Sequence, residues 1–311
     1  MTKMNAVVLG TRGSPLALWQ AERVKQALLA QDEHLQVEVR IIHTQGDKIL
    51  DRPLAAIGDK GLFTKELEEA LYRHEIDIAV HSLKDLPSTL PEGLGITAIL
   101  ERHRPFDALV SAEGLHLEAL PQGALVGTGS LRRKTQLQQL RPDLQFADLR
   151  GNIQTRLAKL DRGDYAAIVM AQAALERMDM GERMAQVFQA EEMLPAVGQG
   201  AIALEGRLED TALRDYVQTI NHTETMLCVS AERAYLKALG GGCEKPIAGY
   251  AVLSEGRLWL RGRIASVDGS QVIADALEIP LLNETLEACE ALGTTLGERM
   301  LAMGGQILLD A

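Results

Sequence analysis

Short apolar segments alternate with amphipathic segments through about the first two hundred residues, and this alternation limits the possible folds most strongly. Residues 6–10 predict a strand. Residues 15–30 predict a helix, with Ser14 as its N-cap and a proline at the first helical position, where no N–H is needed. Residues 76–80 and 95–100 predict further strands. Such alternation is typical of an α/β protein.

A second unit begins after the polar run at residues 101–105 and opens much as the first one does. Gly10-Thr-Arg-Gly-Ser14 precedes one predicted helix, and Gly127-Thr-Gly-Ser130 precedes another. The glycine-rich residues 194–200 and the strand-like residues 201–205 predict a second crossover, which returns the chain to the first unit. We therefore predict two similarly built α/β lobes that hinge around a cleft.

The last part of the chain has a different character. A predicted helix at 223–239 ends at three glycines, and strands follow at 247–253, 257–265 and 271–279, before a last helix at 284–303. This pattern indicates a separate, small α+β domain of antiparallel strands. The predicted boundaries are 1–100 with 200–220 for the first lobe, 101–199 for the second lobe, and 221–311 for the third domain.

Charge and cysteine content exclude several classes of protein. The formal net charge is −11, which argues against a general binder of nucleic acid or of anionic membranes. No apolar stretch reaches membrane-spanning length, and we expect no signal peptide. The three scattered cysteines, Cys228, Cys243 and Cys289, do not suit a disulfide framework. We therefore expect a cytoplasmic protein.

Polar and basic side chains follow the ends of several predicted strands. Arg12 follows the first strand, Lys84 and Asp85 follow the strand that begins at 76, and Arg150 follows residues 144–149. Ligands of α/β sheets bind beyond the carboxyl ends of the strands, where helix N-termini favour anions. The pattern predicts a pocket for a multiply anionic ligand, although a solvated helix face would also explain a run of charges.

Six motifs in one order carry a family resemblance. They lie at residues 9–17 (Leu-Gly-Thr-Arg-Gly-Ser-Pro-Leu-Ala), 81–87 (His-Ser-Leu-Lys-Asp-Leu-Pro), 127–133 (Gly-Thr-Gly-Ser-Leu-Arg-Arg), 149–156 (Leu-Arg-Gly-Asn with Thr-Arg), 194–200 (Leu-Pro-Ala-Val-Gly-Gln-Gly) and 240–243 (Gly-Gly-Gly-Cys). Together they resemble the porphobilinogen deaminase family over nearly the whole chain. The resemblance implies two periplasmic-binding-protein-like (type II) lobes with a hinged cleft, plus a third small α+β domain.

The resemblance also implies a reaction. Members of this family join four porphobilinogen molecules head to tail, release ammonia each time and yield hydroxymethylbilane for tetrapyrrole synthesis. The chain of pyrroles grows on a dipyrromethane cofactor that is linked to a cysteine by a thioether. Each pyrrole carries an acetate and a propionate, which accounts for an arginine-rich cleft.

By resemblance, Cys243 holds the cofactor and Asp85 is the catalytic carboxylate. Taken alone, Cys243 would be read as a small buried hydrophobe, and Asp85 as a helix cap or a partner of Lys84. The residues implied for the cofactor are Cys243, Lys84, Asp85, Ser130, Arg132, Arg133 and Arg150. Those implied for the substrate are Arg12, Ser14, Arg150, Arg156, Arg177 and Gln199, with Gln199 equally consistent with a turn.

The irregular residues 43–61 have many turn formers and predict a functional lid or a disordered segment. In the family this segment lies near the reacting rings, and the resemblance implies Lys60 and Phe63 as lid residues. Ala56 and Asp59 depart from the residues common in relatives, which puts the lid contacts in doubt. His81 is interpreted as a structural hydrogen-bonding residue, with Ser82 on the opposite face of its strand.

The sequence implies no metal, because no histidines or cysteines have ligand spacing. By resemblance we expect a monomer that hands its product to uroporphyrinogen-III synthase. The rival hypothesis is a non-enzymatic two-lobe binding module for organic anions, which would need neither Cys243 nor a third domain. A phosphate-handling transferase is disfavoured because the sequence has no P-loop.

Overall fold

The computed structural model describes residues 4–48, 61–242, 244–281 and 285–310. By its internal contacts the chain divides into two compact units. Of the described residues, the first unit comprises 4–48, 61–103 and 201–226, and the second comprises 104–200, 227–242, 244–281 and 285–310. Within the described residues, no helix has the length and apolar character that crossing a bilayer would require.

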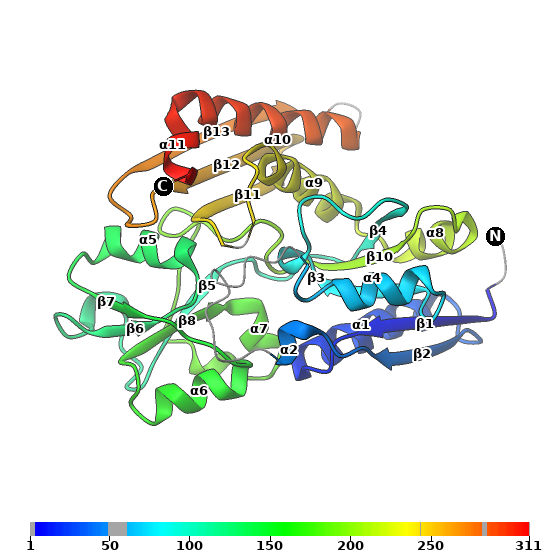
Figure 1. Ribbon diagram of the computed structural model, residues 1–311, viewed down its shortest axis with the longest axis horizontal. Helices are drawn as coiled ribbons and strands as arrows, with labels where there is room; N and C mark the ends of the chain where they lie inside the picture. Colours follow the sequence, from blue (N-terminus) through cyan, green and yellow to red (C-terminus); the bar gives the residue numbers. More distant parts are fainter. Residues whose placement is uncertain (1–3, 49–60, 243, 282–284, 311) are drawn as a thin grey trace. The chain divides into compact units, whose positions relative to one another are not determined.

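The first unit contains a five-stranded mixed sheet in the order β2-β1-β3-β10-β4 (Figure 1). Its strands are β1 (Ala6–Thr11), β2 (Gln36–Ile41), β3 (Ile78–Ser82), β4 (Leu94–Ile99) and β10 (Ile202–Arg207). β1 is parallel to β2 and β3, whereas β10 runs antiparallel to both β3 and β4. The helices are α1 (Pro15–Gln31), α2 (Gln45–Lys48), α4 (Lys65–Tyr72), α8 (Thr211–Val217) and the short 3₁₀ segments η1 (Leu83–Asp85) and η4 (Gln218–Ile220).

Because side chains alternate along the strands, the two faces of this sheet pack into two different hydrophobic cores. Val7 and Leu9 of β1 pack with Val24 and Leu28 of α1, and Ile78 and Val80 of β3 join the same cluster. Ala79, between those two residues of β3, belongs instead to the cluster that contains Leu67 and Leu71 of α4. Successive side chains of a strand point to opposite faces, so α1 and α4 cover opposite faces of the sheet.

The second unit repeats this sheet order with its own strands. The order is β7-β6-β8-β5-β9, with β6 parallel to β7 and β8, and β5 antiparallel to β8 and β9. The strands are β5 (Asp107–Ser111), β6 (Leu125–Gly127), β7 (Gln145–Ala147), β8 (Ala167–Ala171) and β9 (Gln186–Val187). The helices are η2 (Leu117–Ala119), α5 (Leu131–Leu140), α6 (Ile153–Asp161), α7 (Gln172–Arg177) and η3 (Gly181–Arg183).

In each unit, the antiparallel strand is the first strand in the sequence after the chain enters that unit from the other one. This strand is β5 in the second unit, and it is β10 where the chain returns to the first unit. The prediction of two similarly built α/β lobes is therefore confirmed, and the repeated strand order supports it better than the similar turns did.

A three-stranded antiparallel sheet with helices on one face completes the chain (Figure 1). Its elements are α9 (Thr223–Ala238), β11 (Ile247–Ser254), β12 (Arg257–Ala265), β13 (Val272–Pro280), α10 (Leu286–Met300), the π-helical segment η5 (Leu301–Gly305) and α11 (Gln306–Asp310). Gly293 lets α10 approach α9 closely, because a Cβ there would lie 2.1 Å from the carbonyl oxygen of Ala231. The predicted small α+β layer is confirmed. By its contacts it groups with the second unit from Leu227 onward, and its boundary at 221 stays a prediction.

Candidate active site

A pocket in the first unit lies at the carboxyl ends of β1 and β3, where ligands of α/β sheets bind. Polar side chains from four segments face it. The lining residues are Arg12, Ser14, Leu16, Ala17, Gln20, Phe63, Thr64, Val80, His81, Ser82 and Asp85. Four of the residues predicted from the sequence (Arg12, Ser14, Phe63 and Asp85) therefore meet in one pocket.

The start of α1 fixes Arg12 and Ser14. The Ser14 hydroxyl accepts a hydrogen bond from the Ala17 N–H at 3.2 Å, so the predicted N-cap is confirmed. The Thr11 hydroxyl donates to the Ala17 carbonyl at 3.1 Å and ties the end of β1 to the first helical turn. The Arg12 guanidinium stacks 4.1 Å from the centre of the Phe63 ring. The pocket thus combines a cation with the N-terminus of a 17-residue helix, and both favour a bound anion.

Asp85 lies in the 3₁₀ turn that follows β3. The N–H of Leu83 donates to the Ala201 carbonyl at 3.0 Å, and the buried Leu83 side chain anchors the turn. Asp85 is exposed while Lys84 is partly buried. Asp85 is thus presented to the pocket with its carboxyl group accessible to a ligand.

His81 and Ser82 lie on opposite faces of β3, as the strand period predicts. Ser82 and the amide of Gln20 on α1 exchange hydrogen bonds of 2.8 and 3.2 Å. His81 lies on the face that α4 covers, and its Nε2 is 3.0 Å from the Oε2 of Glu205 on β10. Both residues still line the pocket because it lies where the strand ends.

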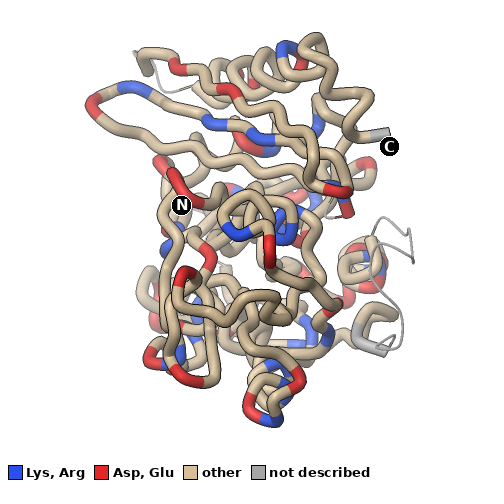
Figure 2. The backbone as a smooth tube through the Cα atoms, turned by 90° about the vertical axis from the view of Figure 1, so that its left-hand side faces the viewer, with Lys and Arg blue, Asp and Glu red and all other residues tan. Residues whose placement is uncertain are grey.

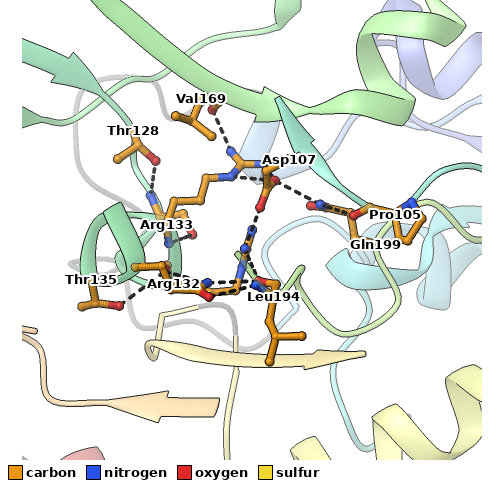
Figure 3. A network of polar contacts seen from close by, with 11 residues as sticks. Pro105, Asp107, Thr128, Arg132, Arg133, Thr135, Val169, Leu194 and Gln199 are labelled. Carbon is orange, nitrogen blue, oxygen red and sulfur yellow. Dashed lines mark hydrogen bonds and ion pairs between the residues drawn. The ribbon is translucent and has the colours of Figure 1, made fainter. Parts of the chain in front are cut away.

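In the second unit, Arg132 and Arg133 are buried around one carboxylate (Figure 3). Arg132 Nη1 donates to Asp107 Oδ2 at 2.7 Å and to the Leu194 carbonyl at 2.8 Å. Arg133 donates to Asp107 Oδ1 from Nε and Nη2, at 3.0 and 2.7 Å, and to the Val169 carbonyl from Nη1. Burial alone would raise the pKa of Asp107, but the two guanidinium groups outweigh it and hold that pKa well below its usual value.

Gln199 and Arg177 are also buried in the second unit. Gln199 donates from Nε2 to the Pro105 carbonyl at 2.6 Å and to Asp107 Oδ1 at 3.0 Å, so it belongs to the same network as the two arginines (Figure 3). Arg177 Nη2 donates to the Gly200 carbonyl at 2.7 Å. Burial lowers the pKa of Arg177 to about 10, so an anion bound beside it would offset an unfavourable desolvation.

Ser130, Arg150 and Arg156 lie at helix starts in the second unit. Ser130 is the N-cap of α5, where its hydroxyl accepts from the Arg133 N–H at 3.5 Å. Asn152 caps α6, and Arg156 Nε donates to the Gly151 carbonyl at 2.8 Å. Gly151 has a φ of 111°, which favours glycine and lets the chain turn sharply between Arg150 and the helix. The structure thus places both arginines beside a capped helix start, as the sequence predicted.

Acidic and basic residues are interspersed along the chain trace (Figure 2). Burial and hydrogen-bond partners, and not a concentration of charge along the chain, therefore distinguish the arginines described above.

Four residues of the sequence interpretation, Cys243, Lys60, Ala56 and Asp59, lie outside the described residues. Cys228 and Cys289 are buried, as expected of packing residues, and burial raises the pKa of Cys289 to about 11. Among the residues that the structure describes, no three or more His, Cys, Asp or Glu side chains are arranged so that they could hold a metal ion.

Three polar residues of these arrangements were not identified from the sequence: Asp107, Gln20 and Glu205. Glu205 offered a signal, because it is a carboxylate that directly follows the apolar residues 201–204. Asp107 also begins an apolar run, but its partners lie 25 and 26 residues away. Gln20 shows no distinguishing feature within its helix.

Two family models match this chain. The model described as porphobilinogen deaminase, dipyromethane cofactor binding domain, matches residues 7–215. The model of the porphobilinogen deaminase C-terminal domain matches residues 226–302. A curated porphobilinogen deaminase from Chloroherpeton thalassium is 45% identical over 304 residues, which cover 98% of this chain and 96% of that protein.

The solved structures that match this chain are much more distant in sequence. The methionine-binding protein MetQ is 14% identical with a TM-score of 0.45, over 70% of this chain and 90% of its own. The probable amino-acid transporter binding protein YtmK from Bacillus subtilis is 13% identical with a TM-score of 0.44, over the same shares. The periplasmic VFT2 domain of Bordetella pertussis BvgS is 17% identical with a TM-score of 0.41, over 70% of this chain and 86% of its own.

Proposed function

This chain belongs to the porphobilinogen deaminase family, and on that premise we propose how its residues carry out the reaction. The family's reaction joins porphobilinogen molecules head to tail on a dipyrromethane cofactor, releases ammonia and yields hydroxymethylbilane. We propose the specific activity of a hydroxymethylbilane synthase, a transferase. The observation that carries the residue assignment is the pocket in which Asp85 and Arg12 meet at the carboxyl ends of β3 and β1.

Asp85 is the group we assign to the chemical step. Loss of ammonia from porphobilinogen leaves a cationic azafulvene, and a carboxylate beside the pyrrole N–H stabilises that positive charge. The exposure of Asp85 at the pocket leaves it accessible to such a cation. The same carboxylate can move a proton at the departing amine and at the ring carbon after coupling.

The acidic side chains of the pyrroles need several cationic partners. Arg12, Ser14 and the N-terminus of α1 together fit one carboxylate in the first unit. Arg150, Arg156 and Arg177 are proposed to bind substrate carboxylates through the second unit. The low pKa of Arg177 supports this role, because a buried guanidinium gains from a bound anion.

The residues present also fit the dipyrromethane cofactor, which is itself acidic and supplies the free α-carbon to which the first substrate is joined. Two guanidinium groups around one carboxylate leave a net positive charge in the network of Arg132, Arg133 and Asp107. We propose that Arg132, Arg133 and Ser130, together with Lys84, Asp85 and Arg150, hold the cofactor, and that Gln199 contacts the substrate. Cys243, which lies outside the described residues, is proposed as the thioether position.

The mass of the purified protein tests this assignment. The intact chain should weigh more than its sequence by one dipyrromethane, and Cys243→Ala should lack the addition. A Cys289→Ala variant is the matched control and should keep it. A protein of unmodified mass that acquires nothing from porphobilinogen would instead favour the rival, a binding module for organic anions.

Four further assignments are proposals. The chain works as a monomer in the cytoplasm, and its product passes to uroporphyrinogen-III synthase. The lid contains Lys60 and Phe63, and the position of Phe63 in the pocket supports that part. The three-part division at 1–100 with 200–220, 101–199 and 221–311 stays a prediction.

A further inference from the structure

Residues 194–200, called the connecting segment below, are bound at both ends to the second lobe. At one end, the Leu194 carbonyl accepts a hydrogen bond from Arg132 on α5 at 2.8 Å. Near the other end, Gln199 donates from Nε2 to Asp107 Oδ1 at 3.0 Å (Figure 3). Both ends of the segment therefore belong to the buried network around the Asp107 carboxylate.

The middle of the connecting segment is bound to the α+β layer that β11–β13 and their helices form within the same unit. The Pro195 carbonyl accepts from the Gly249 N–H at 3.2 Å, and Val197 packs in the hydrophobic core of that layer. The Gly198 N–H donates to Glu232 Oε2 on α9 at 2.7 Å. Contacts with the lobe at both ends thus enclose contacts with the layer in the middle, so the segment couples the two.

Glu232 is the charged member of these contacts, and it is fully buried. Its Oε2 accepts from the Gly198 N–H, and its Oε1 accepts from the Ala251 N–H of β11 at 2.8 Å. A buried carboxylate costs desolvation free energy, which charge-assisted hydrogen bonds offset. An apolar side chain would avoid that cost, but it would not fix the direction of two backbone groups. The carboxylate therefore sets the position of Gly198 relative to β11.

The backbone around Gln199 depends on such a constraint. Gly198 and Gly200 flank this residue, with φ angles of 71° and 88°, in the left-handed region that favours glycine. Glycine has access to many backbone conformations, so two glycines alone would leave the Gln199 side chain without a fixed origin. The hydrogen bond from Gly198 to Glu232 lies one residue before Gln199 and limits this freedom.

We propose that Glu232 is a positioning residue, which holds Gln199 in the conformation that contacts the substrate by fixing the Gly198 N–H of the connecting segment. This inference rests on the proposed function, in which Gln199 contacts porphobilinogen. Helix α9, which carries Glu232, ends at Ala238, shortly before Cys243 in the sequence. The same carboxylate therefore ties the connecting segment to the helix that precedes the proposed thioether position.

Steady-state kinetics of a Glu232→Met holoenzyme test the proposal. The methionine side chain has a similar length, but its thioether is too weak an acceptor to replace the carboxylate. We expect the KM for porphobilinogen to rise about tenfold, the order of effect that one misplaced hydrogen bond produces. The kcat should stay near the wild-type value, because Asp85 belongs to the first unit. If this variant does not fold, Glu232→Asp replaces it, since a carboxylate one methylene shorter cannot reach both N–H groups, and its KM should also rise.

A double-mutant cycle with Gln199 separates positioning from a general loss of structure. Gln199→Ala should raise the KM by itself. The Glu232 variant should then add nothing to that increase, because the contact through which it acts is already absent. Leu258→Ala, in the hydrophobic core of the same layer, is the matched control. It should lower the melting temperature while leaving the KM at the wild-type value.

Three results would overturn the proposal: a wild-type KM in the Glu232 variant that folds, a wild-type KM in Gln199→Ala, or single-variant increases that multiply in the double variant. A KM that rises equally in Leu258→Ala would also overturn it, since instability alone would then explain the change. Failure of the proposed function is a separate result, because the wild type would then carry no dipyrromethane and release no ammonia from porphobilinogen.

Discussion

The two units share a local structure at the start of α1 and the start of α5, but the arginines beside it have different surroundings. In both, a strand in the second position of its sheet leads through a short turn to a serine N-cap, Ser14 or Ser130. The turn of the first unit directs Arg12 toward a pocket, whereas the helix of the second unit buries Arg132 and Arg133 against Asp107. Similar turns therefore do not imply similar sites.

The first residue of the antiparallel strand in each sheet, β10 or β5, accounts for the different surroundings of these arginines. In the first unit its first residue is Ile202, which pairs with Ser82 at the end of β3. In the second unit the corresponding residue is Asp107, which pairs with Ala171 at the end of β8. An aspartate at this position pairs with two buried arginines, whereas an isoleucine at the corresponding position contributes no charge to the first unit. A single side chain on the antiparallel strand thus decides whether the arginines at this end of the sheet are paired with a buried carboxylate.

The largest effect that would test this comparison is the loss of the buried carboxylate. Asp107→Ala leaves two guanidinium groups buried without their counter-charge, which should lower the free energy of unfolding by about 3–5 kcal/mol. Denaturant unfolding of the holoenzyme measures it. Asp143→Ala removes the partner of the more exposed Arg141 and should cost far less. Equal losses in the two variants would contradict a structural role specific to Asp107.

The corresponding test in the first unit concerns catalysis. Asp85→Asn should lower kcat by roughly 10²–10³-fold, because the amide cannot offer a full negative charge to the azafulvene cation. The melting temperature and the mass of the attached cofactor should both stay at wild-type values, since Asp85 is exposed. Near-normal turnover of this variant would remove Asp85 from the chemical step.

The pH dependence of stability sharpens the contrast between the units. The two arginines lower the pKa of folded Asp107 from its ordinary value of 3.8, so its stabilising contribution is fully present above that pH. The contribution is lost as the pH falls toward the lower pKa of the folded state, at about 1.4 kcal/mol per pH unit. Unfolding measured between pH 5 and pH 3 should therefore be steeper in pH for the wild type than for Asp107→Asn. Parallel curves would mean that the carboxylate is not held ionised by the arginines.

The smallest expected effect compares the two caps. Ser14→Ala and Ser130→Ala should each cost about 1 kcal/mol of stability, because each serine accepts a hydrogen bond from the first turn of its helix. Only Ser14→Ala should also raise the KM for porphobilinogen, since Ser14 lines the pocket. Steady-state kinetics beside thermal unfolding would show whether Ser130 acts on the substrate as well.

Local sequence patterns predicted much of this fold and part of the site. The strand period placed His81 and Ser82 on opposite faces, and Pro15 with Ser14 marked the start of α1. Strand β5 was missed because only three apolar residues separate Asp107 from Ser111. The roles of Asp107 and Glu205 depend on contacts between elements far apart in sequence, a strand with a helix for Asp107 and two strands for Glu205, and such contacts have no local signature.

The insertion of β10 between β3 and β4 has a consequence for synthesis of the chain. β4 pairs with no described strand other than β10, which is more than a hundred residues later in the sequence. A nascent chain that ends near residue 200 would therefore present the unpaired backbone of both β3 and β4 to other molecules. Translation must pass residue 207 before the first lobe can close, so premature termination in the intervening stretch should give an aggregation-prone fragment.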